Sequence, residues 1–326
     1  MILGLVFALG GLGALTFGAD EFVKGAARLA IIFKVAPVVV GAVIIGFGTS
    51  APEMVVSGLA AGQDDLDIGV GNVIGSNVAN VSLVLAAATL ITVVPVGSRV
   101  LRREAPLSVG SCIVFALVIQ NGIERWEGAL LAVLLVLALS WILRSARDGD
   151  PLADEIEEFV DQDEELQTST EVVRTVLGLI AVVVASWFLV EGAIRVADAL
   201  DLTGGFVGFT LVALGTSAPE LITAVAAARQ GETEILVGNL LGSNMFNSLA
   251  VGAVIGLVGP GPVLDTTLGE VGAILMVGIV VLSWLMMISK RGVERWEGSV
   301  LIVLWLAAVV ILSSGDEAAA AVLGSF

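Results

Sequence analysis

The chain has 326 residues, of which 57% are hydrophobic and 14% are charged, and its mean hydropathy is +1.02. These values exclude an ordinary soluble globular protein and indicate a polytopic membrane protein. The formal net charge is -17. There is no histidine and only one cysteine, Cys112, so no internal disulfide can form. Zinc and copper sites, which need histidine or clustered cysteines, are therefore disfavoured.

Ten apolar stretches are long enough to cross a bilayer as helices, which takes on the order of 20 residues. In chain order they are residues 2–19, 36–61, 68–92, 106–120, 126–143, 172–199, 203–228, 234–258, 268–288 and 297–314. None shows the alternation of apolar and polar residues that outer-membrane barrels require. We therefore predict an all-α polytopic membrane protein with ten transmembrane helices and no strands.

The basic residues predict the orientation of these spans. With the N-terminus outside, 13 of the 15 lysines and arginines fall in inner loops, and only Arg125 and Arg195 fall outside. The inner set is Lys24, Arg28, Lys34, Arg99, Arg102, Arg103, Arg144, Arg147, Arg174, Arg229, Lys290, Arg291 and Arg295. We expect a multi-pass protein of the plasma membrane with both termini outside.

An acidic segment separates spans five and six. It holds ten of the 32 acidic residues between Asp148 and Glu165, on the predicted cytoplasmic side. It lacks the spaced ligands and the glycine of an EF-hand loop, so a solvated linker is favoured over a cation-sensing element.

The sequence is an internal duplication. An offset of 167 residues superposes Gly48–Glu53 (GTSAPE) on Gly215–Glu220 (GTSAPE) and Gly71–Asn80 (GNVIGSNVAN) on Gly238–Asn247 (GNLLGSNMFN). A further motif, ERWEG, recurs from Glu124 and from Glu294. Each half then carries five spans, and because five is odd the second half enters the membrane from the opposite side. We predict a first repeat over residues 1–143, an acidic linker over 144–171 and a second, inverted repeat over 172–326, as in secondary transporters.

Polar residues in the two GTSAPE segments share one helix face. Thr49 and Ser50 lie four and three residues before Glu53, and Thr216 and Ser217 stand in the same relation to Glu220. A proline in each segment interrupts the helix and frees a backbone carbonyl. An unpaired glutamate costs at least about 2.5 kcal/mol at the centre of a bilayer, so two duplicated glutamates indicate a functional site rather than packing.

Spans three and eight add further oxygen donors. Asn72, Ser76 and Asn80 recur every four residues, and span eight repeats the pattern with Asn239, Ser243 and Asn247. Asn77 and Asn244 lie off this face, and we expect them to pack rather than bind. Carboxylates, hydroxyls, amides and freed carbonyls are hard ligands that suit Ca²⁺ and Na⁺.

The paired GTSAPE and GN-x-x-GSN-x-x-N segments resemble the alpha repeats of the cation/calcium antiporter superfamily, specifically its sodium/calcium exchanger branch. The resemblance spans nearly the whole chain. It implies that spans two, three, seven and eight surround four cation sites, across which the first and sixth spans slide. Carried over to this sequence, it makes Glu53 and Glu220 the central Ca²⁺ ligands. The remaining expected ligands are Thr49, Ser50, Thr216, Ser217, Ser76, Asn80, Ser243, Asn247 and the carbonyls near Gly46 and Ala213.

One departure from the family affects the expected coupling. Many exchangers of this branch have an aspartate at one of the positions that Asn80 and Asn247 occupy. With only two carboxylates, three Na⁺ would leave the site with one excess positive charge, so the ion ratio stays open. Proton-coupled or K⁺-dependent cation antiport is the alternative within the superfamily. We expect Ca²⁺ and Na⁺ as transported ions, the lipid bilayer as surroundings, and no cofactor, nucleic acid or obligate protein partner.

Two other classes of function are alternatives to antiport. An intramembrane hydrolase could use Ser50 or Ser217 as nucleophile, but histidine is absent and every lysine falls near a span end. A cation channel could use the same ligands, yet the inverted and broken helices do not require an open pore. Antiport, without enzymatic activity, is the predicted function.

Overall fold

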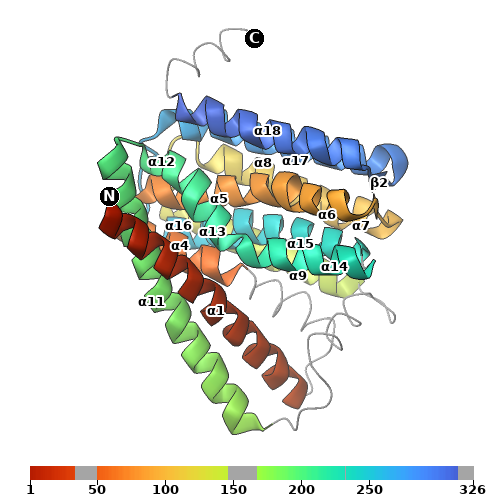
Figure 1. Ribbon diagram of the computed structural model, residues 1–326, viewed down its shortest axis with the longest axis horizontal. Coiled ribbons are helices and arrows are strands. Elements are labelled where there is room, and N and C mark those ends of the chain that lie inside the picture. Colours follow the sequence, from red (N-terminus) through yellow and green to blue (C-terminus); the bar gives the residue numbers. More distant parts are fainter. Residues whose placement is uncertain (34–49, 146–166, 232, 315–326) are drawn as a thin grey trace.

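The computed structural model describes residues 1–33, 50–145, 167–231 and 233–314, and these are almost entirely helical (Figure 1). Within these ranges eight helices, or nine with one bent pair, are long and apolar enough to cross a membrane. They correspond to nine of the ten predicted spans. The second span, residues 36–61, lies partly outside the described residues, as do most of the acidic linker and the predicted ligands Gly46 and Thr49.

The first half contains eight labelled helices or strands and one π-helical turn. In order they are α1 (Ile2–Ile32), α4 (Ala51–Gly62), α5 (Leu66–Ala79), the π-turn Asn80–Val84, α6 (Leu85–Ile91), β1 (Val94–Pro95), α7 (Ser98–Arg102), α8 (Glu104–Val118) and α9 (Arg125–Ser145). The apolar sequence forms continuous helices because backbone groups in a bilayer must be hydrogen-bonded within their own segment.

The second half has a comparable series of helices, but its strand lies directly before its last helix, whereas β1 lies between α6 and α7. Its elements are α11 (Thr168–Leu200), α12 (Gly204–Val207), the π-turn Gly208–Val212, α13 (Ala213–Thr216), α14 (Ala218–Gln230), α15 (Thr233–Phe246), the π-turn Asn247–Val251, α16 (Gly252–Val258), the π-turn Leu268–Gly272, α17 (Ala273–Lys290), β2 (Gly292–Val293) and α18 (Arg295–Ser313). In Figure 1 the α5–α6 segment runs toward the end of the molecule that holds β2, whereas α15–α16 runs the other way.

The two halves contact each other through short backbone pairings directly before the ERWEG segments. Each ERWEG segment begins a helix, α9 or α18. Before α18, Val293 pairs with Val94 in a short antiparallel contact between β2 and β1, and before α9, Ile123 pairs with Gly261. The β1–β2 contact therefore joins the second half to the loop that follows span three of the first half. The Ile123–Gly261 contact joins the first half to the loop that follows span eight of the second half. The expectation of a strand-free fold was wrong at β1 and β2, because these loop ends lie beside each other and share backbone hydrogen bonds.

Both ERWEG segments form the same cap. The backbone N–H of Glu124 donates to the Glu127 carboxylate over 2.8 Å, and that of Glu294 donates to Glu297 over the same distance. The indole N–H of Trp126 donates to Glu124, as the indole of Trp296 does to Glu294. These interactions satisfy groups that helix starts otherwise leave unpaired.

Helices α1 and α11 form a long antiparallel pair at one side of the molecule (Figure 1). Small residues lie in this contact at seven-residue intervals: Gly4, Gly11, Gly18 and Gly25 on α1 and Gly178, Ala185 and Gly192 on α11. A Cβ at Gly11 would approach the Leu189 nitrogen to 2.6 Å, and one at Gly25 would approach the Thr175 hydroxyl to 2.5 Å. Small residues are needed because the two backbones approach so closely.

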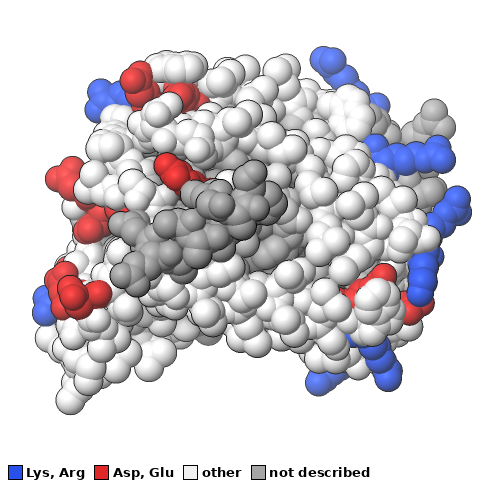
Figure 2. Space-filling view, turned by 90° about the horizontal axis from the view of Figure 1, so that it is seen from above, with Lys and Arg blue, Asp and Glu red and all other residues white. Residues whose placement is uncertain are grey.

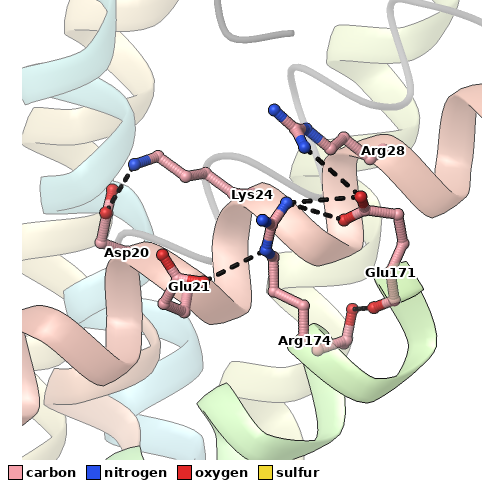
Figure 3. A network of polar contacts seen from close by, with 7 residues as sticks. Asp20, Glu21, Lys24, Arg28, Glu171 and Arg174 are labelled. Atoms are coloured by element: carbon pink, nitrogen blue, oxygen red, sulfur yellow. Dashed lines mark hydrogen bonds and ion pairs between the residues drawn. The ribbon is translucent and has the colours of Figure 1, made fainter. Parts of the chain in front are cut away.

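Helix α1 is longer than predicted, because its charged end is paired with α11 (Figure 3). The predicted span ended at residue 19, yet the helix continues to Ile32. The buried Glu171 on α11 accepts from Arg28 over 3.3 Å and from Arg174 over 3.1 Å, and Arg174 also pairs with Glu21 over 3.1 Å. Glu21, Arg28, Glu171 and Arg174 thus form a cluster of ion pairs between the two helices. Neutralised side chains allow the helix to continue past its apolar part.

The charges divide between the two ends of the molecule (Figure 2). Most of the visible lysine and arginine lies at the right-hand end and most of the visible aspartate and glutamate at the left. Asp65 lies between α4 and α5, and its pKa is raised by partial burial and by the neighbouring Asp198 and Asp64. This division agrees with the sequence-based assignment of basic loops to one side of the membrane.

Candidate cation-binding site

The two GTSAPE segments form the same local structure. Ser50 and Ser217 each precede a new helix, with backbone φ and ψ of -90° and 3° for Ser50 and -84° and 6° for Ser217. Proline is tolerated at the start of a helix because its missing N–H would be unpaired there in any case. The second segment is bent by 43° between α13 and α14. The predicted proline break is thus present at Ser217, and the described part of the first segment shows the matching helix start at Ala51.

Each break places a glutamate in the first turn of a helix. Glu53 is the third residue of α4 and Glu220 the third residue of α14. The positive end of the helix dipole stabilises a carboxylate there by about 0.3–1 kcal/mol. The two carboxylates are close enough to interact electrostatically, and Thr216 from the second half lies beside Glu53. The breaks therefore bring two negative groups together at one place in the protein.

Both glutamates are completely buried, and among the described residues none of their four carboxylate oxygens has a hydrogen-bond partner. None of the ion pairs within the described residues involves either one. The hydroxyls of Ser50, Ser217 and Ser243 are likewise buried without partners. Buried charges are normally paired, because desolvation costs several kcal/mol per ion. The donor set is one that a bound cation would satisfy.

A π-helical turn begins at each of the predicted asparagine ligands. Asn80 opens the turn Asn80–Val84 between α5 and α6, and Asn247 opens the turn Asn247–Val251 between α15 and α16. Both side chains are fully buried, and neither Asn80 Oδ1 nor either amide atom of Asn247 has a partner in the described structure. Such turns are frequent at functional sites, and hydrophobic periodicity gives no signal for them.

The serine and threonine of the predicted face are linked across the halves by Asn72. The Thr216 hydroxyl donates to Asn72 Oδ1 over 3.1 Å, and the Ser76 hydroxyl donates to the same oxygen over 3.4 Å. The Asn72 amide in turn donates to the Ser57 hydroxyl over 2.9 Å. Asn72 thus joins α5 to the second half, a role that its spacing alone did not reveal.

The structure buries every predicted ligand that it describes. These residues are Glu53, Glu220, Ser50, Ser217, Thr216, Ser76, Asn80, Ser243, Asn247 and Ala213. The Ala213 carbonyl accepts the Ser217 N–H over 3.0 Å, so in this state it is occupied by a helical hydrogen bond. Gly46 and Thr49 cannot be placed, because they lie outside the described residues. No cluster of three acidic or cysteine ligands occurs within the described ranges. The negative charge of the candidate site therefore comes from the carboxylates of Glu53 and Glu220.

Comparison with known proteins agrees with this geometry. The model of the family "Sodium/calcium exchanger protein" matches residues 3–144 and 170–314. The chain belongs to the sodium/calcium exchanger family. The family's two matched segments coincide with the two halves, and its members are cation antiporters rather than enzymes.

Relatives of this family are similar over nearly their whole length. A putative antiporter, CaxA, of Alkalimonas amylolytica is 33% identical over 96% of this chain and 100% of its own. The sodium/calcium exchanger MaX1 of Methanosarcina acetivorans is 29% identical over 96% and 97%. The sodium-calcium exchanger NCX_Mj, soaked with Na⁺ and Sr²⁺, matches with a TM-score of 0.66 at 30% identity, over 95% of this chain and 98% of that one. Family and fold are thus shown by independent comparisons.

Proposed function

We propose that the protein is a Na⁺/Ca²⁺ antiporter that works by alternating access. The observation that carries the proposal is the set of four unpaired carboxylate oxygens on Glu53 and Glu220, surrounded by buried hydroxyls and amides. Two carboxylates neutralise one Ca²⁺ or two Na⁺, so the ions compete for one set of oxygens. An empty site does not cross readily, because it would expose uncompensated buried charge to the low dielectric of the membrane. Competition and this barrier together couple the two fluxes.

The architecture we propose is two inverted repeats of five spans, over residues 1–143 and 172–326, joined by an acidic cytoplasmic linker at 144–171. The opposite directions of α5–α6 and α15–α16 support the inversion. The basic end of the molecule would face the cytoplasm of a cell whose plasma membrane the protein spans, with both termini outside. Cysteine accessibility from each side of sealed vesicles, at positions 64 and 291, tests this orientation.

The test of function is uptake of radioactive Ca²⁺ into proteoliposomes of the purified protein. Vesicles would be loaded with Na⁺, K⁺, choline or acidic buffer and diluted into choline at fixed external pH. We expect uptake only from Na⁺-loaded vesicles. Uptake driven by a proton gradient without Na⁺ would instead identify a proton-coupled antiporter, and a requirement for K⁺ a K⁺-dependent one. The same assay with charge movement measured per Ca²⁺ gives the ion ratio.

A further inference from the structure

Two buried asparagines beside the site, Asn77 and Asn244, are counterparts in the two halves. They were expected to pack only, yet each lies in a hydrogen-bond network. The Asn80 amide nitrogen donates to Asn244 Oδ1 over 3.0 Å, and the Asn244 amide nitrogen donates to the Asn77 backbone carbonyl over 3.1 Å. These bonds connect a proposed ligand of one half to the other half of the protein.

The direction of these bonds matters for cation binding. An asparagine amide can present either its oxygen or its NH₂ group, and only the oxygen binds a cation. A backbone carbonyl can only accept, so it fixes the amide of Asn244, and Asn244 Oδ1 in turn fixes the amide of Asn80. The result is that Asn80 Oδ1 is left without a protein partner. Asn80 is therefore held with its oxygen available.

The equivalent bond in the other half is not made. By the 167-residue correspondence it would run from the Asn247 amide nitrogen to Asn77 Oδ1, and both atoms are buried without partners. Asn77 instead donates to the Ser248 hydroxyl over 2.9 Å. The counterpart of Ser248 is Val81, whose side chain cannot accept a hydrogen bond. Asn77 also donates to the Met276 sulfur over 3.4 Å, and the counterpart of Met276 is Val109. Sequence differences at both partners of Asn77 thus accompany the difference in bonding.

We propose that Asn77 and Asn244 are positioning residues that turn the amide oxygens of Asn247 and Asn80 toward the transported ion, and that Asn80 alone is held ready in the described state. The proposal rests on the proposed function, because it concerns ligands of the antiport site. It makes the two amide ligands unequal: Asn80 is preorganised, and Asn247 becomes oriented only when it pairs with Asn77.

A double-mutant cycle between positions 244 and 80 tests the role of Asn244. We expect Asn244→Leu to raise the Ca²⁺ concentration for half-maximal uptake about tenfold, the effect of one lost buried hydrogen bond, with a smaller change in maximal rate. In an Asn80→Asp background, Asn244→Leu should change the Ca²⁺ concentration for half-maximal uptake less than about twofold. The reason is that both terminal atoms of a carboxylate are oxygens, so the side chain needs no orientation. Equilibrium Ca²⁺ binding to the purified protein should follow the same pattern.

Two further variants complete the experiment. Ser82→Ala is the matched control, because Ser82 is buried in the same π-turn but bonds only to Val78 of its own helix. Ser248→Val frees Asn77 to pair with Asn247 and should lower the half-saturating Ca²⁺ concentration. An equal loss from Asn244→Leu in both backgrounds, or unchanged affinity in Ser248→Val, would overturn the proposal. Absence of Ca²⁺ uptake by the unmodified protein would overturn the proposed function instead.

Discussion

The two copies of the GN-x-x-GSN-x-x-N segment have nearly the same residues but different surroundings. On α5, Gly71, Asn72 and Gly75 are buried, and a Cβ at Gly75 would approach the Ala213 side chain to 2.6 Å. On α15, the counterparts Gly238, Asn239 and Gly242 are partly exposed. The residues that correspond to Phe209 and Ala213, which lie against Gly75, are Ala42 and Gly46, and these two lie outside the described residues. The same motif therefore differs in burial between the two halves.

The difference indicates how a duplicated chain can serve an alternating-access mechanism. A carrier must expose its site to one side at a time, so its two halves must differ at any moment, although their sequences can be alike. Within the described residues α5 packs against α12 and α13 and its motif glycines are buried, whereas those of α15 are partly exposed. Substitutions at matched positions of the two halves, compared by their effects on Ca²⁺ uptake and melting temperature, show where the halves are equivalent and where they differ.

The largest effect is expected where the halves are most alike, at the two glutamates. Glu53→Gln and Glu220→Gln should each reduce Ca²⁺ uptake by at least about a hundredfold, because one remaining carboxylate cannot neutralise a divalent ion. Glu191→Gln is the matched control, since Glu191 is partly exposed and pairs with Arg195 on its own helix. Normal exchange in either site variant, with correct folding, would remove these residues from the site.

A smaller and unequal effect is expected at the glycines. Gly75→Ala should lower the melting temperature by several degrees and the uptake rate about tenfold, because overpacking costs about 1–3 kcal/mol. Gly242→Ala should stay within about twofold of the unmodified protein, since Gly242 is partly exposed. Thermal unfolding in detergent and the uptake assay give both values. Equal responses at the two positions would contradict the difference between the halves.

The smallest effect on transport, but a clear one on stability, is expected at a pair of arginines. Arg28 and Arg195 are counterparts, yet Arg28 is buried against Glu171 and Arg195 is exposed above the Phe7 ring. Arg28→Ala should cost about 1.5–3 kcal/mol, because the buried Glu171 loses one of its two arginine partners and keeps Arg174, and Arg195→Ala should cost about 1 kcal/mol or less. Melting temperatures of the two variants provide the measurement. In Arg28→Met with Glu171→Met, stability should largely return.

Much of this arrangement follows from local sequence. The long apolar runs predicted nine spans that the structure contains. The second GTSAPE segment predicted the break before Glu220, whereas the residues before Ser50 in the first segment lie outside the described ranges. The length of α1 was missed because Lys24 and Arg28 looked like loop residues, whereas Arg28 pairs with Glu171 on α11 and Lys24 pairs with Asp20 on α1 itself. The strands β1 and β2 were missed because two-residue pairings between distant loops leave no periodic signal.

What the sequence by itself determined is the membrane class, the duplication and the identity of the buried oxygen ligands. Helical periodicity and the cost of polar groups in a bilayer act locally, so they can be read from spacing. Only the tertiary structure decided which way the amide of Asn80 is held, because Asn244 reaches it from the opposite half, whereas neither amide atom of Asn247 has a partner among the described residues. Hydrogen-bond direction depends on partners far apart in the chain, and two identical motifs can therefore have different states in one folded protein.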